Sequence, residues 1–269
     1  MKFRLIPLAA ALFACAPLSA MADASAGSGS AAPYKSNQKP APAAAAAPAA
    51  TSGGLTGTFD ITTNYMDRGV SDSNNLPAVQ GGWTYTFAST GIYFNLWGSS
   101  LNELDTQNNI ATLELDTIIG ITNPVGEHFT YNINITRYNY PKAAASYSEL
   151  IASAQWYFIT ALIGYSTNVY DTHGNGTYYN LGFKYDVPPD YIFGLDNMNV
   201  SGGVGHYSLP ARGGLSSYND YNLAVTKTIG NYALQLQWTD TNGSSFRRFY
   251  DPAPPIRGSH FIGTVTYNF

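Results

Sequence analysis

Nine charged or amide side chains are the residues of this chain whose types and positions could do chemistry. Seven of them fall on the polar face of stretches in which apolar and polar residues alternate, and Arg68 and Gln80 are grouped with them. Separate acids and bases along one polar face can contact a polar solute, and their acidic excess mildly favours cations. The nine residues are Asp60, Arg68, Gln80, Glu114, Asp116, Glu149, Lys184, Asp186 and Asp220.

The same residues also allow a structural interpretation. Arg68 or Lys184 could pair with a carboxylate and brace the interior of a narrow closed sheet. The acids considered as partners are Glu114, Asp116 and Glu149. Solute selection and bracing both stay open, and one network could serve both.

The histidines do not form a catalytic or metal-binding pattern. His173 is beside Asp171 and His206 lies near Ser208, but ordinary surface histidines explain both pairs. The four histidines lack the spacing of metal ligands, and no phosphate-binding loop or paired-histidine motif is present. The sequence therefore predicts no catalytic residue, no metal site, no cofactor and no enzyme.

A long connection at 241–258 combines arginines with aromatic residues and prolines. Its basic residues are Arg247, Arg248 and Arg257. Arginine beside aromatics could contact the phosphates and sugars of lipopolysaccharide, or the segment could fold inward as a constriction. An ordered surface loop without a ligand is the alternative.

These side chains must be positioned by strands. Residues 55–64, 79–87, 129–136, 178–187 and 232–239 alternate with a period of two, as do 261–269. One face is apolar and aromatic, and the other carries Thr, Asn and Gln. Charged residues make up only 11% of the chain, against about 25% in typical globular proteins. We expect an all-β fold, a transmembrane antiparallel up-and-down barrel with lipid outside and a polar lumen inside. The net charge of −4 argues against a nucleic-acid partner.

The connections between these strands alternate in length. Short links are expected at 88–91, 123–127, around Tyr157 and at 230–231, and longer ones at 66–77, 101–109, 140–146, 168–176, 208–217 and 241–258. The link at 188–198 is the exception. This pattern predicts about twelve strands, with periplasmic turns at one end and extracellular loops at the other.

The N-terminal region predicts export. A basic start, an apolar run and the small residues Ala20 and Ala22 indicate a signal peptide at 1–22. A lipoprotein signal at Cys15 is the alternative. Residues 23–53 are rich in Ala and Pro and predict a disordered periplasmic linker, either a tether or an inert spacer. The barrel is then expected at 54–269.

The order of several short motifs resembles one bacterial family. The opening 55–65, then Arg68-Gly-Val-Ser71 and 77–82, is followed by Trp97-Gly-Ser99, 138–141 and Tyr218-Asn-Asp-Tyr221. Together they resemble the TorF-like porin family (Gcw_chp, bacterial protein of unknown function) over about 55–269. The resemblance implies an outer-membrane barrel and, more weakly, a pore, but no substrate. A terminal Phe269 resembles the signal that the barrel assembly machinery reads.

The expected function is a porin-like channel in the bacterial outer membrane for passive diffusion of small polar solutes, with a mild cation preference. Its other expected contacts are outer-membrane lipid and lipopolysaccharide. The alternative is a non-conducting structural or adhesive barrel, because inward-facing aromatics could fill a narrow lumen. These are Tyr93, Trp97, Tyr138 and Tyr178. Arg137 has lipid-facing parity near a strand end, where its head could reach the interface.

Overall fold

The computed structural model describes residues 53–104, 110–141, 143, 145–189, 196–211, 215–242 and 258–269. The predicted signal peptide at 1–22 and nearly all of the predicted linker at 23–53 lie outside these residues. So do Arg247, Arg248 and Arg257 of the long connection, whose predicted contacts with lipopolysaccharide stay a prediction.

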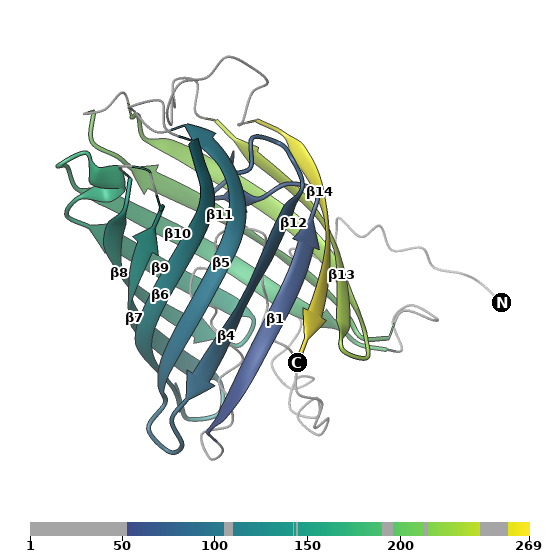
Figure 1. Cartoon of the computed structure of the whole chain (residues 1–269). Helices are drawn as coiled ribbons and strands as arrows, with labels where there is room; N and C mark the ends of the chain where they lie inside the picture. The colour runs from purple at the N-terminus through teal and green to yellow at the C-terminus, as the bar shows by residue number, and fades with distance from the viewer. Residues whose placement is uncertain are drawn as a thin grey trace. The chain divides into compact units, whose positions relative to one another are not determined.

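Twelve antiparallel strands close into one barrel, in sequence order except for a small inner pair (Figure 1). The prediction of an antiparallel up-and-down transmembrane barrel of about twelve strands is confirmed. The wall strands are β1 (Gly54–Thr62), β4 (Ala78–Thr86), β5 (Ile92–Leu104), β6 (Ile110–Val125), β7 (Phe129–Asn139), β8 (Tyr147–Trp156), β9 (Ile159–Ser166), β10 (Gly176–Val187), β11 (Met198–Ser208), β12 (Tyr218–Ile229), β13 (Tyr232–Thr241) and β14 (His260–Asn268).

The two ends of the barrel differ in their connections. The end that carries the links 87–91, 126–128, 157–158, 188–197 and 230–231, together with Gly54 and Phe269, is called the turn end here. The opposite end, called the loop end, carries 63–77 and the other longer connections. The predicted alternation is therefore correct. Two strands run further than expected: β6 continues through Pro124 to Val125, and β5 continues to Leu104.

The outer surface of the wall is apolar because every second side chain points away from the interior. Exposed Ile, Leu and Val side chains cover its middle, as on Ile133, Ile135 and Leu223. Exposed aromatic side chains gather near the turn end, on Tyr85, Phe87, Phe129, Trp156, Tyr185, Tyr232, Tyr267 and Phe269. An apolar band next to an aromatic belt is the surface that a bilayer and its interface require. In the described part of the chain, no helix has the length and apolar character needed to cross a membrane.

The interior changes character along the barrel. Near the loop end, buried tyrosines and aliphatic residues form a cluster that includes Tyr138, Tyr147, Tyr207 and Tyr218. Near the turn end, several inward side chains are polar and half-buried, as on Asn95, Gln155 and Thr228, whereas Tyr93, Thr122 and Asn132 are buried there. The sequence predicted a polar lumen, with a lumen filled by inward-facing aromatics as the alternative. The difference arises because connections at the loop end turn inward and bury apolar residues such as Val169 of the short 3-10 helix η3 (Val169–Asp171) and Leu215.

The seam of the barrel is the pairing of its first strand, β1, with its last strand, β14. It is the shorter of the two pairings that β1 makes. Five residue pairs join β1 to β14, whereas nine join β1 to β4. Three further backbone hydrogen bonds extend the seam, from Gly57 N to Phe269 O at 2.9 Å, from Phe269 N to Gly57 O at 3.0 Å and from Thr63 N to Gly263 O at 2.9 Å. The seam therefore closes the barrel with fewer bonds than its neighbour.

Gly91, in the turn between β4 and β5, should be irreplaceable. Its φ is +70°, in the region that favours glycine, and a Cβ atom at this position would collide with the Thr122 carbonyl oxygen. Gly91→Ala should lower the free energy of unfolding by about 1–3 kcal/mol, because backbone must shift to admit the methyl group. Denaturant unfolding of the refolded barrel measures this.

Gly126 provides the matched control. Its φ of +66° is similar, but nothing lies within 4 Å of its Cβ position. Gly126→Ala should therefore carry only the cost of the backbone conformation, about 1 kcal/mol. Equal losses for the two variants would contradict the crowding argument.

Candidate functional site in the barrel interior

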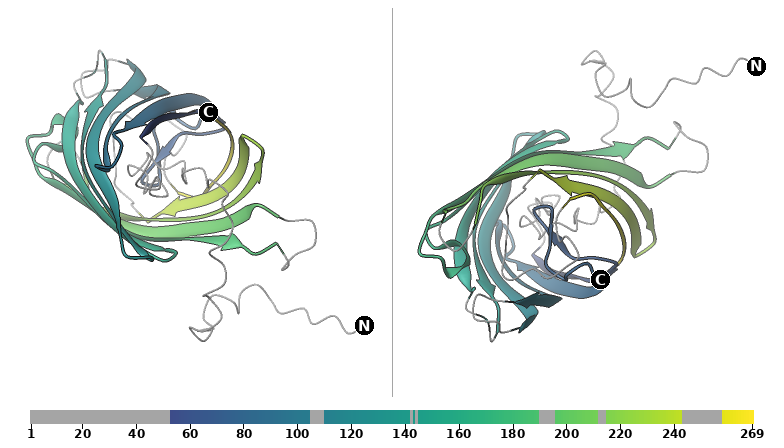
Figure 2. Two further views of the ribbon diagram at one scale, coloured as in Figure 1. Left: turned by 90° about the horizontal axis from the view of Figure 1, so that it is seen from below. Right: turned by 90° about the horizontal axis from the view of Figure 1, so that it is seen from above.

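A hairpin folds into the barrel from the loop end. β2 (Met66–Asp67) pairs with β3 (Val70–Ser71) within the connection that joins β1 to β4. We call residues 65–72 the inner hairpin. Figure 2, along the barrel axis, shows it inside the ring of wall strands. All eight of its side chains except that of Gly69 are among the buried residues, so the hairpin fills space that an open pore would leave to water.

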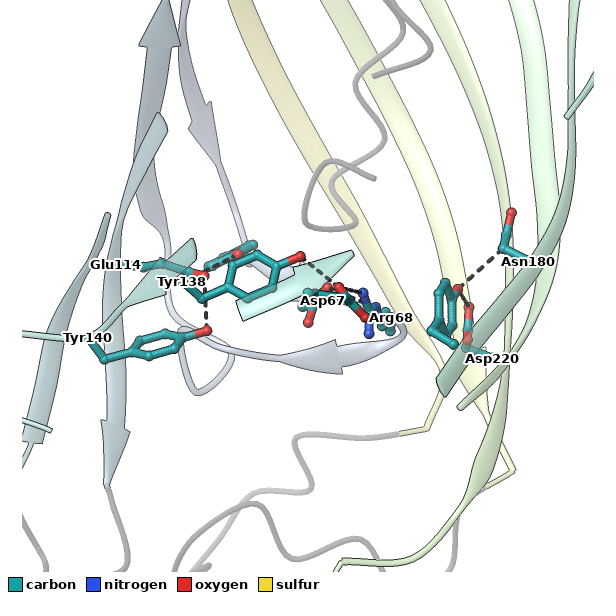
Figure 3. Close-up of polar contacts among 10 residues, drawn as sticks. Asp67, Arg68, Glu114, Tyr138, Tyr140, Asn180 and Asp220 are labelled. Atoms are coloured by element: carbon teal, nitrogen blue, oxygen red, sulfur yellow. Dashed lines mark hydrogen bonds and ion pairs between the residues drawn. The ribbon is translucent and has the colours of Figure 1, made fainter. Parts of the chain in front are cut away.

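The tip of the inner hairpin reaches the opposite wall through Arg68. Its Nη2 donates to Glu149 Oε2 on β8 at 2.6 Å. Its guanidinium carbon lies 4.3 Å from the ring centre of Tyr178 on β10 and 4.5 Å from that of Tyr207 on β11. Two cation–π contacts and a buried ion pair, made by residues of three strands, thus hold the Arg68 side chain in place. In Figure 3, Asp67 and Arg68 lie between the group around Glu114 and the group around Asp220.

The base of the inner hairpin is held through Glu114 on β6. Tyr65 Oη donates to Glu114 Oε2 at 2.9 Å, and Tyr140 Oη donates to Glu114 Oε1 at 3.0 Å. The Tyr65 ring also packs against Trp97, with ring centres 5.6 Å apart. Because both carboxylate oxygens accept a phenolic hydrogen, this acid can stay buried at the barrel wall.

Tyrosine hydroxyls bind two more acids in the same region. Tyr138 Oη donates to Glu149 Oε2 at 2.9 Å, and Tyr178 Oη donates to Asp220 Oδ1 at 3.2 Å. Thus Tyr178 contacts the arginine with its ring face and an acid with its hydroxyl. The arrangement is a connected polar network that spans from β6 to β12 through the inner hairpin.

The structure brings five of the nine predicted residues into this region: Arg68, Glu114, Asp116, Glu149 and Asp220. The ion pair from Arg68 to Glu149 is one of those that the bracing interpretation considered.

Asp60 and Gln80 lie opposite each other on β1 and β4, buried on the inner face. Asp60 Oδ2 accepts from Thr58 Oγ1 at 3.3 Å, and Gln80 Nε2 donates to Ser99 Oγ at 3.1 Å.

Lys184 and Asp186 lie apart from the network. Both are on β10 near the turn end, where Lys184 is half-buried and Asp186 is exposed. Another pair lies near this end, where Lys227 Nζ donates to Asp196 Oδ1 at 3.2 Å. That hydrogen bond and the positive charge lower the pKa of the Asp196 carboxyl group. Charges at the turn end are thus solvated, unlike those around the inner hairpin.

Several residues of the network were missed by sequence reasoning. Tyr65, Tyr140 and Tyr207 were not singled out, and neither were the buried acids Asp67 and Asp72. Tyr65-Met66 and Val70 placed apolar side chains in a segment interpreted as a polar connection. Those three apolar residues were a signal that the segment is buried.

Arg137 lies on the outer surface, one row beyond the last exposed isoleucine of β7. Its Nε donates a hydrogen bond to Asn139 Oδ1 at 3.4 Å, and its Nη1 donates one to Ser148 Oγ at 3.5 Å. The neighbours at the loop end are therefore polar, which places the edge of the apolar band just below this row.

The charge inside the barrel is strongly asymmetric. Among the described buried side chains are seven carboxyl groups and one guanidinium group. The acids are Asp60, Asp67, Asp72, Glu114, Asp116, Glu149 and Asp220. No group of three or more His, Cys, Asp or Glu side chains in the described residues could hold a metal ion.

The sequence matches one family model, described as a bacterial protein of unknown function (Gcw_chp), over residues 44–253. No curated protein matches the sequence significantly.

Solved membrane barrels share the fold at low identity. A chain from work on the mechanism behind the in-meso crystallization of membrane proteins is 6% identical, over 80% of this chain and 83% of its own, with a TM-score of 0.50. The KdgM porin, solved with disordered oligogalacturonate, is 7% identical over 80% and 98% of the two chains, with a TM-score of 0.47. The outer membrane protein OpdK from Pseudomonas aeruginosa is 13% identical over 80% of this chain and 66% of its own, with a TM-score of 0.38. Such identities concern the fold alone.

Proposed function

We propose a function on the premise that the chain belongs to the Gcw_chp family, a family of bacterial proteins of unknown function. The chain is a porin-like barrel of the bacterial outer membrane that lets small polar solutes diffuse passively. As part of this proposal, the chain is a TorF-like porin. The observation that carries it is the closed barrel, apolar outside and lined inside by polar and acidic side chains.

The orientation and partners follow from the same proposal. The turn end faces the periplasm and the loop end faces outward, as in other outer-membrane barrels. Outer-membrane lipid and lipopolysaccharide surround the apolar band, the signal peptide directs export, and Phe269 is read by the barrel assembly machinery. None of these roles requires catalysis, so no enzymatic activity is proposed.

Conductance of the refolded barrel in a planar bilayer tests the channel. We expect discrete steps of reproducible size. In a salt gradient, the reversal potential should give a cation-to-anion permeability ratio above one, because carboxyl groups outnumber the guanidinium group inside. Glu114→Gln keeps the side-chain shape and removes one acid, so it should lower this ratio.

Arg137→Gln is the matched control for the ratio, because it changes one charge on the outer surface. It should leave the permeability ratio unchanged. An anion-selective channel would overturn the cation preference but leave the channel itself intact. Folded barrels that never conduct, both unsubstituted and with Arg68→Ala, would overturn the channel.

The inner hairpin favours a second candidate, a non-conducting structural or adhesive barrel. Its buried side chains occupy the loop-end half of the interior together with the tyrosine cluster. The polar, half-buried turn-end half favours the channel instead, because a purely structural core would be packed along its whole length. Conductance decides between the two.

A further inference from the structure

We infer that the inner hairpin is a closing element of the pore, anchored by Arg68, and that conduction requires its release from Glu149, Tyr178 and Tyr207. This inference rests on the proposed channel and names how that channel is closed. It assigns to Arg68 a role in gating that is distinct from lining a permanently open lumen.

The hairpin crosses the interior within the buried tyrosine cluster, to which its Tyr65 and Val70 belong. It starts at the end of β1, contacts Glu114 on β6 through Tyr65, and contacts β8, β10 and β11 through Arg68. A Cβ atom at Gly69 would lie 2.5 Å from Thr241 Cγ2, so the tip also touches β13. The hairpin therefore bridges opposite sides of the wall, and on this inference it obstructs a solute while it is seated.

The hairpin keeps its shape through its own hydrogen bonds. Asp72 N donates to Tyr65 O at 2.8 Å, and Tyr65 N donates to Ser73 Oγ at 2.9 Å. Ser71 Oγ donates to Asn64 Oδ1 at 2.6 Å. Because these bonds lie within residues 64–73, the hairpin can move as one body and keep them.

The contacts described at β8, β10 and β11, by contrast, come from the Arg68 side chain. Moving the hairpin therefore gives up one ion pair and two ring contacts at these strands. It also gives up the Tyr65 hydrogen bond to Glu114, the Asn102 N to Asp72 O hydrogen bond at 3.2 Å and the burial of Met66 and Val70, but it unpairs no wall strand. A change of this kind is a rearrangement between two packed states and leaves the barrel intact.

The Arg68 anchor makes an ion pair and two ring contacts, but not every polar atom of the ion pair is hydrogen-bonded. Arg68 is only 6% exposed, and among the described residues its Nη1 and Glu149 Oε1 have no hydrogen-bond partner. A buried ion pair must offset the loss of hydration of both charges, and incomplete bonding makes this harder. Arg68 also has a φ of +47°, which is unfavourable for a residue with a side chain. The closed state is therefore held by a contact that can be released.

Arg68→Ala tests the anchor in a planar bilayer. It removes the ion pair and both ring contacts, so the occupancy of the conducting state should rise about tenfold or more over the unsubstituted chain. Arg137→Ala, an arginine truncated on the outer surface, should match the unsubstituted chain. Heat-dependent migration on gels and circular dichroism verify that each variant is folded.

A reversible disulfide gives an independent test, because the oxidised and reduced forms of one variant are compared and the strain of a cysteine at Gly69 is common to both. In a Cys15→Ser background, Gly69→Cys combined with Thr241→Cys places two sulfur atoms where the tip touches β13. Conductance should fall under oxidation and return after reduction. The single Gly69→Cys variant, treated identically, should not respond to oxidation.

The outcomes separate this inference from the proposed channel. A silent unsubstituted chain with a conducting Arg68→Ala variant supports both. Conduction that neither Arg68→Ala nor the oxidised disulfide alters overturns the closing element and leaves the channel standing. Folded variants that are all silent overturn both.

Discussion

Glu149→Leu should make the inner hairpin open far more often within an intact barrel. The substitution leaves the Arg68 guanidinium buried beside two rings without its carboxylate partner. An uncompensated buried charge costs about 3–5 kcal/mol, and this cost falls on the seated hairpin. Native-state hydrogen exchange at the Asn102 amide of β5, which donates to Asp72 O of the hairpin at 3.2 Å, should report a free energy of opening lowered by that amount.

The double variant Arg68→Met with Glu149→Leu is the control. It replaces both charges by apolar groups of similar length, a change that is often neutral or stabilising at buried ion pairs. Protection of the Asn102 amide should return to near its original value. If Glu149→Leu alone leaves that protection unchanged, Arg68 does not hold the hairpin in place.

Ile133→Arg should destabilise the whole barrel. Ile133 is exposed on the outer face in the middle of β7, between inward-facing Asn132 and Asn134. An arginine facing lipid at the midplane costs about 2–4 kcal/mol, because the guanidinium loses its hydration. Reversible denaturant unfolding from lipid vesicles, followed by tryptophan fluorescence, measures the loss.

Ile133→Leu is the matched substitution, since it keeps the site apolar and should change stability little. Arg137 offers an internal comparison, because this natural arginine lies four residues further along β7 on the same face. Equal stability of the arginine and leucine variants at position 133 would mean that this face does not meet lipid.

The wall of the barrel could be predicted because period-two alternation is local. Stretches such as 129–136 show in the sequence alone which side chains point out and which point in. The strand count followed from the alternation of short and long connections. The ends of strands were less predictable, as β6 shows, because pairing with a neighbour can carry a strand through a proline at its edge.

The interior network could be predicted only in part, because it depends on contacts between distant segments. Strand parity indicated that Glu114, Glu149 and Asp220 face inward. It could not indicate that residues 65–72 leave the loop end and enter the barrel. Arg68 and Glu149 are 81 residues apart, and no local pattern relates them.

The narrow seam bears on how the chain reaches its final form. β1 and β14 lie at opposite ends of the barrel sequence, and the bond from Gly263 N to Thr63 Oγ1 joins residues 200 positions apart. Contacts of such long range form late, since the entropy of loop closure must be overcome before they stabilise anything. Until then both strands expose unpaired backbone groups, which invite aggregation in water and are costly in lipid. Ring closure and entry into the bilayer are therefore coupled events, and the first place for the finished ring to reopen is the five-pair junction of β1 with β14.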